Sequence, residues 1–166
     1  MLLMTLLMFP YSIYTSGYPI PKQTENDFNP IFKDVIPSLK QKTLIPPALP
    51  TYISQEEKKP IYARLGQVTP SYYEIEIAFD KECNWSTACH YGFVSGKKTL
   101  SNKYSRGKQV ELAKGIIGYF IEGPCEASCS DSTIRWKQNG YVYSIGIKGG
   151  NIKHLTKAAI SAIEGK

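Results

Sequence analysis

The sequence lacks an apolar run long enough to cross a membrane. It begins with M-L-L-M-T-L-L-M-F, an apolar run of nine residues, whereas a transmembrane helix needs about 20. The small residues of Y-T-S-G follow at 14–17, as at a signal-peptidase site, although no basic residue precedes the run. We therefore predict a signal peptide over residues 1–17, export to the periplasm or the cell exterior, and no stable transmembrane span. No cysteine follows the run, which argues against a lipid anchor.

Signatures of catalysis and of nucleotide binding are also missing. The sequence contains no G-x-S-x-G, no H-E-x-x-H and no P-loop, patterns that mark hydrolases, zinc proteases and nucleotide-binding proteins. It has no recognised nucleic-acid-binding motif either, and export would separate it from nucleic acid. We therefore expect a protein that is not an enzyme, needs no cofactor and has no nucleic-acid partner.

Histidine, the commonest general base at neutral pH, occurs only twice. His154 falls on the polar side of a predicted C-terminal helix, beside Lys157, which indicates a solvent-exposed residue. His90 begins a predicted strand and could meet Glu82, Asp131 or a serine in space. A structural role is the simpler interpretation for His90. The alternative is a small secreted hydrolase that uses His90 with a nearby acid.

Cysteine is scarce, but the number of cysteines is even. The four cysteines form two close pairs, Cys83 with Cys89 and Cys125 with Cys129, and an even number in an exported chain favours disulfides. A redox site would be expected to have C-x-x-C before a helix, and a zinc site would have shorter spacings than five intervening residues. We predict structural disulfides and no metal site, with pairing inside each loop favoured and crossed pairings left open.

The prolines that are present mark a boundary. Eight of the eleven lie between Pro19 and Pro60, which indicates a proline-rich leader over residues 18–60. Asn29-Pro30 predicts the start of a short helix in this leader, and Pro37 should shorten or kink it. The apolar face of this helix is formed by Phe32, Val35, Ile36 and Leu39.

From residue 61 onward the pattern becomes one of alternating polar and apolar positions. Glu74 and Glu76 alternate with apolar residues in a predicted strand, so the pair indicates a polar, solvent-facing side more simply than a glycosidase acid pair. Asn139-Gly140 predicts a type I′ hairpin. In that hairpin, Gln138 pairs with Tyr141, Trp136 with Tyr143 and Ile134 with Ile145, and the other face carries Arg135, Lys137, Val142 and Ser144.

Together these patterns predict an α+β fold over residues 61–166. The expected architecture is an antiparallel sheet of about six meandering strands, with a C-terminal helix and the short N-terminal helix packed on one face. The C-terminal helix should be capped by Asn151. Its apolar face should consist of Ile152, Leu155, Ala159, Ala162 and Ile163.

Acidic residues are absent between Glu82 and Glu111, and this gap is the most informative feature of the charge pattern. Basic and aromatic side chains occupy it, and the chain as a whole carries a formal charge of +6. Such a stretch favours an anionic ligand, although a solvated loop has the same composition. The candidate ligand-binding residues are Lys97, Lys98, Lys103, Tyr104, Arg106 and Lys108.

Several segments resemble a group of uncharacterised small secreted proteins, mostly cyanobacterial, and are similar to bacterial extracytoplasmic domains of unknown function. The resemblance covers roughly residues 36–163. It rests on I-P-S-L-K-Q-K-T, L-P-T-Y-I, Y-E-I-E-I-A-F, C-N-W-S-T-A-C-H-Y-G, G-Y-F-I-E-G-P-C-E-A-S-C-S-D-S and W-K-Q-N-G-Y-V-Y-S-I-G-I. The resemblance implies an exported α+β domain and no catalytic residues.

The hypothesis that follows is an extracytoplasmic binding or interaction domain. Its expected partner is an anionic polysaccharide, a lipid headgroup or an envelope protein. A second alternative to it, besides the hydrolase, is a structural or inhibitory domain that presents the loop of residues 123–132, made rigid by a Cys125–Cys129 disulfide. A protruding loop would favour this alternative.

Overall fold

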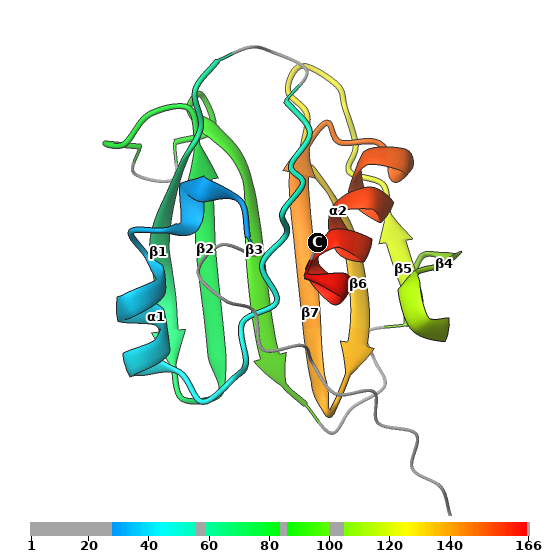
Figure 1. Ribbon diagram of the computed structural model, residues 1–166. Coiled ribbons are helices and arrows are strands. Elements are labelled where there is room, and N and C mark those ends of the chain that lie inside the picture. The colour runs from blue at the N-terminus through cyan, green and yellow to red at the C-terminus, as the bar shows by residue number, and fades with distance from the viewer. Residues whose placement is uncertain (1–27, 56–58, 84–85, 100–104, 166) are drawn as a thin grey trace, which may run out of the picture.

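The fold is a single seven-stranded antiparallel sheet in the order β1-β2-β3-β7-β6-β5-β4 (Figure 1). The computed structural model describes residues 28–55, 59–83, 86–99 and 105–165. The strands are β1 (Tyr62–Thr69), β2 (Tyr72–Ala78), β3 (His90–Lys98), β4 (Lys108–Glu111), β5 (Ile117–Ile121), β6 (Asp131–Gln138) and β7 (Tyr141–Lys148). The predicted α+β class is confirmed, with seven strands where about six were expected.

The strand order shows that the sheet consists of two meanders. Strands β1, β2 and β3 follow one another, and the chain then passes to the far edge of the sheet. From β4 it returns strand by strand until β7 pairs with β3. Consecutive strands β3 and β4 are therefore separated by three others.

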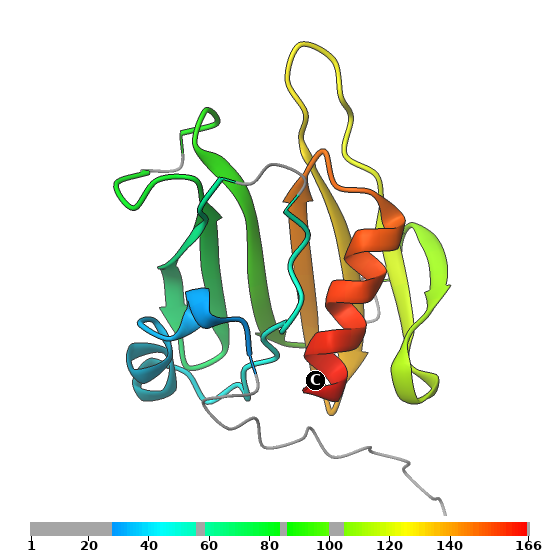
Figure 2. The ribbon, with the colours of Figure 1, turned by 45° about the horizontal axis from the view of Figure 1, so that its top comes forward.

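Helices lie on one face of the sheet. The short helix α1 (Ile36–Lys42) packs by β1, and α2 (Ile152–Glu164) packs across β6 and β7 (Figures 1 and 2). Two 3-10 turns, η1 (Pro30–Phe32) and η2 (Ala113–Gly115), are the other helical elements of the described residues. Within the described residues, the opposite face of the sheet carries no helix.

The described part of the proline-rich segment, residues 28–55, forms part of the same core as the sheet. Ile45, Leu49 and Ile53 are buried in one cluster with the apolar residues of the strands and α2. The buried hydroxyl of Tyr143 donates to the Pro46 carbonyl (2.9 Å), and the Ala48 N–H donates to the Tyr73 hydroxyl (3.1 Å). These bonds satisfy polar groups that would otherwise be buried without partners.

The first helix begins later than the sequence pattern indicates. Asn29 caps only the η1 turn, where its side chain accepts a hydrogen bond from the Ile31 N–H (3.2 Å). Helix α1 begins at Ile36, so Pro37 stands in its first turn, the part of a helix where a residue without an N–H is tolerated. The four predicted apolar residues are nevertheless all buried.

The C-terminal hairpin and helix agree with the sequence prediction. Asn139 and Gly140 have φ angles of 52° and 82°, as a type I′ turn requires, and the predicted pairs across β6 and β7 are all present. Asn151 caps α2 by accepting a hydrogen bond from the His154 N–H (3.0 Å). The Asn151 cap therefore starts α2 close to the end of β7 at Lys148.

Both disulfides are local. Cys83 pairs with Cys89 at a Cα–Cα distance of 5.8 Å, and Cys125 pairs with Cys129 at 4.0 Å. No helix in the described residues is long and apolar enough to cross a membrane.

Candidate functional site

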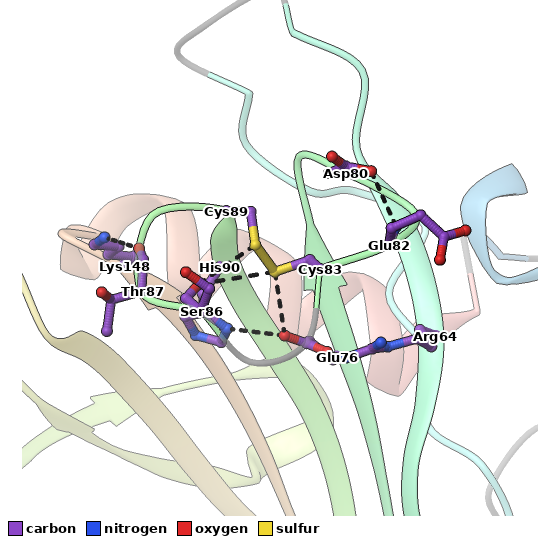
Figure 3. Close-up of a disulfide and its surroundings, with 10 residues drawn as sticks. All are labelled: Arg64, Glu76, Asp80, Glu82, Cys83, Ser86, Thr87, Cys89, His90 and Lys148. Carbon is purple, nitrogen blue, oxygen red and sulfur yellow. Dashed lines mark hydrogen bonds and ion pairs between the residues drawn. A yellow bond between two sulfur atoms is a disulfide. The ribbon is translucent and has the colours of Figure 1, made fainter.

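Four charged side chains from four strands meet at one end of the sheet, on its helix-free face. Arg64 of β1 forms an ion pair with Glu76 of β2. His90, at the start of β3, lies with Nδ1 3.8 Å from Glu76 Oε1 and with Nε2 2.9 Å from Asp131 Oδ2. We call Arg64, Glu76, His90 and Asp131 the ionic cluster, and Figure 3 shows the first three of them.

A bulge between β2 and β3 brings His90 into the ionic cluster. Ile77 pairs with Gly92, but the next residue, Ala78, pairs with His90 because β3 contains one extra residue there. Such a bulge re-aims the side chains beside it. Tyr91, the extra residue, instead donates its hydroxyl to the Ser54 carbonyl on the helix side of the sheet.

The prediction that Glu76 faces solvent was wrong. Its side chain is fully buried, because the Cys83–Cys89 disulfide lies over it, with Cys83 Sγ 3.8 Å from Glu76 Oε1 (Figure 3). A carboxylate is stable in such a place only when it is paired, and Arg64 and His90 provide the partners. Glu74 is half-buried and accepts a hydrogen bond from the Tyr72 hydroxyl (2.6 Å).

The ionic cluster raises the pKa of His90. The hydrogen bond to Asp131 is the largest cause that raises its pKa above the usual 6.5, and Glu76 adds to the effect against the opposing effect of burial. Its Nε2 is bonded to Asp131 and its Nδ1 is buried. His90 therefore lies within hydrogen-bond reach of a carboxylate, the geometry that the hydrolase alternative requires of a general base, and its Nε2 is engaged by Asp131. The predicted contact with Asp131 is confirmed, whereas Glu82 bonds through its backbone N–H to Asp80 (2.9 Å).

His154 is half-buried, so the prediction that it is a solvated residue missed a contact. Its Nδ1 lies 2.7 Å from the hydroxyl of Tyr52, and the two rings stack with centroids 6.3 Å apart. Tyr52 reaches α2 because the proline-rich segment crosses the sheet beside this helix (Figure 1). A helical pattern alone does not reveal a contact between residues so far apart in the chain.

A cavity of about 330 Å³ lies between the start of β3, the end of β7 and the start of α2. Both histidines are on its wall. Its lining consists of Ser54, Phe79, Ala88, His90, Tyr91, Cys129, Ile147, Lys148, Gly149, Gly150, Asn151 and His154.

The predicted anionic-ligand residues are spread over the sheet. Lys97 and Lys98 are exposed on β3, whereas Lys108 is in β4 and Arg106 just before it. Because β7, β6 and β5 lie between β3 and β4, the two groups are separated by four inter-strand spacings of about 4.8 Å, or roughly 19 Å. Lys103 and Tyr104 lie outside the described residues.

Sheet register instead brings Lys97 together with two other basic residues. Lys97 pairs with Val142, which pairs with Lys137, so both lysines occupy one row of the helix-free face. Arg135 lies in the next row on the same face, opposite Ser144. We call Lys97, Arg135 and Lys137 the basic strip. Alternation had placed Arg135 and Lys137 on one face of the hairpin, but only strand order shows that Lys97 joins them.

The loop that carries the second disulfide protrudes from the end of the sheet (Figure 2). Its residues 124–128 are exposed. Its base is held by the Ser130 N–H, which donates to the Pro124 carbonyl (2.9 Å), and by the Gly149 N–H, which donates to the Ser130 carbonyl (3.1 Å). A protruding loop is the feature that favours the loop-presenting alternative.

Comparisons with known proteins add no relative: no family model, no curated protein and no solved structure matches the chain. Among the described residues, no group of three or more histidine, cysteine, aspartate or glutamate side chains is placed to hold a metal ion.

Proposed function

We propose that the protein is an exported binding domain that holds an anionic polysaccharide along the helix-free face of its sheet. The observation that carries the proposal is the basic strip, three cations on adjacent rows of a face that no described helix covers. The two disulfides support export, because such bonds persist in oxidising compartments. We place the protein in the periplasm or outside the cell.

The spacing of the strip suits an extended polymer. Lys97 and Lys137 are two strands apart, about 10 Å at the usual strand spacing, and Arg135 continues the strip along β6. A linear polyanion can contact all three cations at once, which increases its affinity without strong individual contacts.

Aromatic rings beside the strip offer surfaces for sugar rings. Tyr119 pairs with Arg135 across β5 and β6. Phe93 lies across Gly146, where an added Cβ would approach the Phe93 ring to 2.2 Å. Both side chains are half-buried, and an aromatic face combines apolar area with low conformational entropy.

The acidic residues on this face weaken the strip little. Glu76 and Asp131 are paired with Arg64 and His90 in the ionic cluster. Glu74 lies across β3 and β7 from Arg135, and Glu111 is on the edge strand β4. Positive charge therefore dominates the middle of the face.

The test is retention on immobilised alginate and heparin at increasing salt. We expect the variant Lys97→Glu/Arg135→Glu/Lys137→Glu to elute at lower salt and to bind free alginate about tenfold more weakly or worse, given up to about 1 kcal/mol for each exposed ion pair. The control, Lys40→Glu/Lys42→Glu/Lys98→Glu, makes the same charge change away from the strip, on α1 and on the other side of β3. Equal elution of the two variants would refute the strip as the binding surface.

The protruding loop supports a second candidate function, presentation of Glu126, Ala127 and Ser128 to a protein partner. The test compares the envelope proteins retained by the wild type, by Glu126→Lys/Ser128→Arg and by the strip variant. Loss of a specific protein only with the loop variant would favour loop presentation. Retention that depends only on the strip would reject it.

A further inference from the structure

The cavity at the start of α2 is preformed by contacts between distant parts of the chain. Its volume of about 330 Å³ lies in the range of small-molecule sites. The Tyr91 hydroxyl, on β3, donates to the Ser54 carbonyl of the proline-rich segment. The Gly149 N–H donates to the Ser130 carbonyl (3.1 Å), and the Gly150 N–H donates to the Ile147 carbonyl (2.9 Å). These bonds hold the walls in place without a ligand.

The charge of the lining is of one sign. Of the described residues that line the cavity, none is acidic, while Lys148 and two imidazoles are present. Lys148 Nζ donates to the Thr87 carbonyl (2.5 Å), which positions the ammonium with one of its three donors engaged. His90 is already paired with Glu76 and Asp131, so Lys148 is the main cation that the cavity offers.

One wall of the cavity is apolar. Phe79 and Tyr91 pack edge to face with ring centroids 5.1 Å apart, and Ile147 and Ala88 also line the cavity. A ligand that fits this cavity therefore combines an anionic group with an apolar body.

We infer that this cavity binds a small organic acid. The carboxylate faces Lys148 and the imidazole of His154, and the apolar body contacts Phe79, Tyr91 and Ile147. The inference is independent of the polysaccharide proposal, since no residue of the basic strip lines the cavity.

The test is an NMR titration of the full-length, disulfide-intact protein with three ligands of one shape: benzoate, benzamide and benzylammonium. We expect benzoate to cause saturable shifts of the Gly149, Gly150 and His154 amides. Benzamide should bind more weakly, and benzylammonium should leave these amides unchanged. Absence of a saturable benzoate shift, or equal shifts with benzylammonium, would overturn the inference.

Two single variants test whether the carboxylate of the ligand binds at Lys148. Lys148→Gln should raise the dissociation constant for benzoate about tenfold, the effect of losing one charge-assisted hydrogen bond. Lys153→Gln removes the same charge from an exposed residue of α2 that does not line the cavity, and should have little effect. Equal effects of the two variants would reject a specific site at Lys148.

A third variant tests the cavity itself. Ala88 lies at the exposed rim, so Ala88→Trp should obstruct the cavity and abolish the benzoate shifts while the remaining amide spectrum stays that of the folded protein. The basic-strip variant should bind benzoate as the wild type does. Benzoate binding that persists in Ala88→Trp, or that disappears with the strip, would place the ligand elsewhere.

Discussion

At the scale of single residues, Glu76 has the most demanding environment. Its carboxylate is fully buried between Arg64 and His90, while the Arg64 side chain remains 34% exposed. Removing one partner of a buried pair costs more free energy than the pair itself contributes, because a charge is left without compensation. The ionic cluster therefore links the stability of β1, β2 and β3.

We expect Glu76→Gln to lower the free energy of unfolding by about 2–3 kcal/mol, less than the roughly 3–5 kcal/mol usual for a fully buried pair because Arg64 can reach water. Glu74→Gln makes the same chemical change two residues away at a half-buried position, and should cost no more than about 0.5 kcal/mol. Urea denaturation at pH 7 measures both. Similar losses would show that the burial of Glu76 does not matter energetically.

His90 should make stability depend on pH. Because Asp131 raises its pKa in the folded state above the usual 6.5, the folded protein binds its proton more tightly than the unfolded chain does. The stabilisation is complete below about pH 6.5 and is lost as pH rises through the folded-state pKa. The difference in unfolding free energy between the wild type and His90→Gln should therefore shrink from pH 6 to pH 9. A difference that stays constant or grows would contradict this assignment.

At the scale of elements, the two disulfides close loops of similar length but with different surroundings. Cys83 is buried against Glu76, whereas the Cys125–Cys129 loop projects from the sheet. Closing either of these short loops stabilises the folded protein by a similar amount, about 2 kcal/mol. Their surroundings should therefore decide which disulfide matters more.

We expect Cys83→Ala/Cys89→Ala to lower the melting temperature more than Cys125→Ala/Cys129→Ala, because only the first exposes the buried carboxylate. Differential scanning calorimetry of both double variants measures the two losses. An equal or larger loss from the protruding loop would indicate that the cover over Glu76 adds nothing.

At the scale of the whole molecule, the proline-rich segment closes the core over the sheet. Its prolines have no N–H groups, so the segment cannot extend the sheet as a further inner strand. It is joined to the sheet instead by side chains and by the hydroxyls of Tyr73 and Tyr143. Tyr73 is completely buried, so its bond to the Ala48 N–H has no water to replace it.

We expect Tyr73→Phe to destabilise the fold by about 1–2 kcal/mol, because the buried Ala48 N–H loses its acceptor. Hydrogen exchange at Ala48 should accelerate, and denaturation with urea should show the loss. Tyr62→Phe removes a hydroxyl from a half-buried position on β1 and provides the control. If Ala48 exchanges at an unchanged rate in Tyr73→Phe, the segment is held by other contacts.

Interactions between residues close in sequence could be predicted from the sequence alone. Asn139-Gly140 determines the hairpin because its backbone geometry and the apolar alternation on both sides require the same register. Asn151 determines the start of α2 in the same way. Each disulfide closes a short loop whose ends cannot move far apart.

Only the tertiary structure decided the candidate sites. The burial of Glu76 requires a disulfide loop to lie over a strand position that alternation marks as outward, and the bulge at Ala78 decides which side of the sheet His90 faces. The basic strip and the cavity combine residues from strands that are adjacent only because β7 pairs with β3. Sequence pattern determines which side of an element a residue occupies, whereas its neighbours depend on strand order and register, which long-range packing sets.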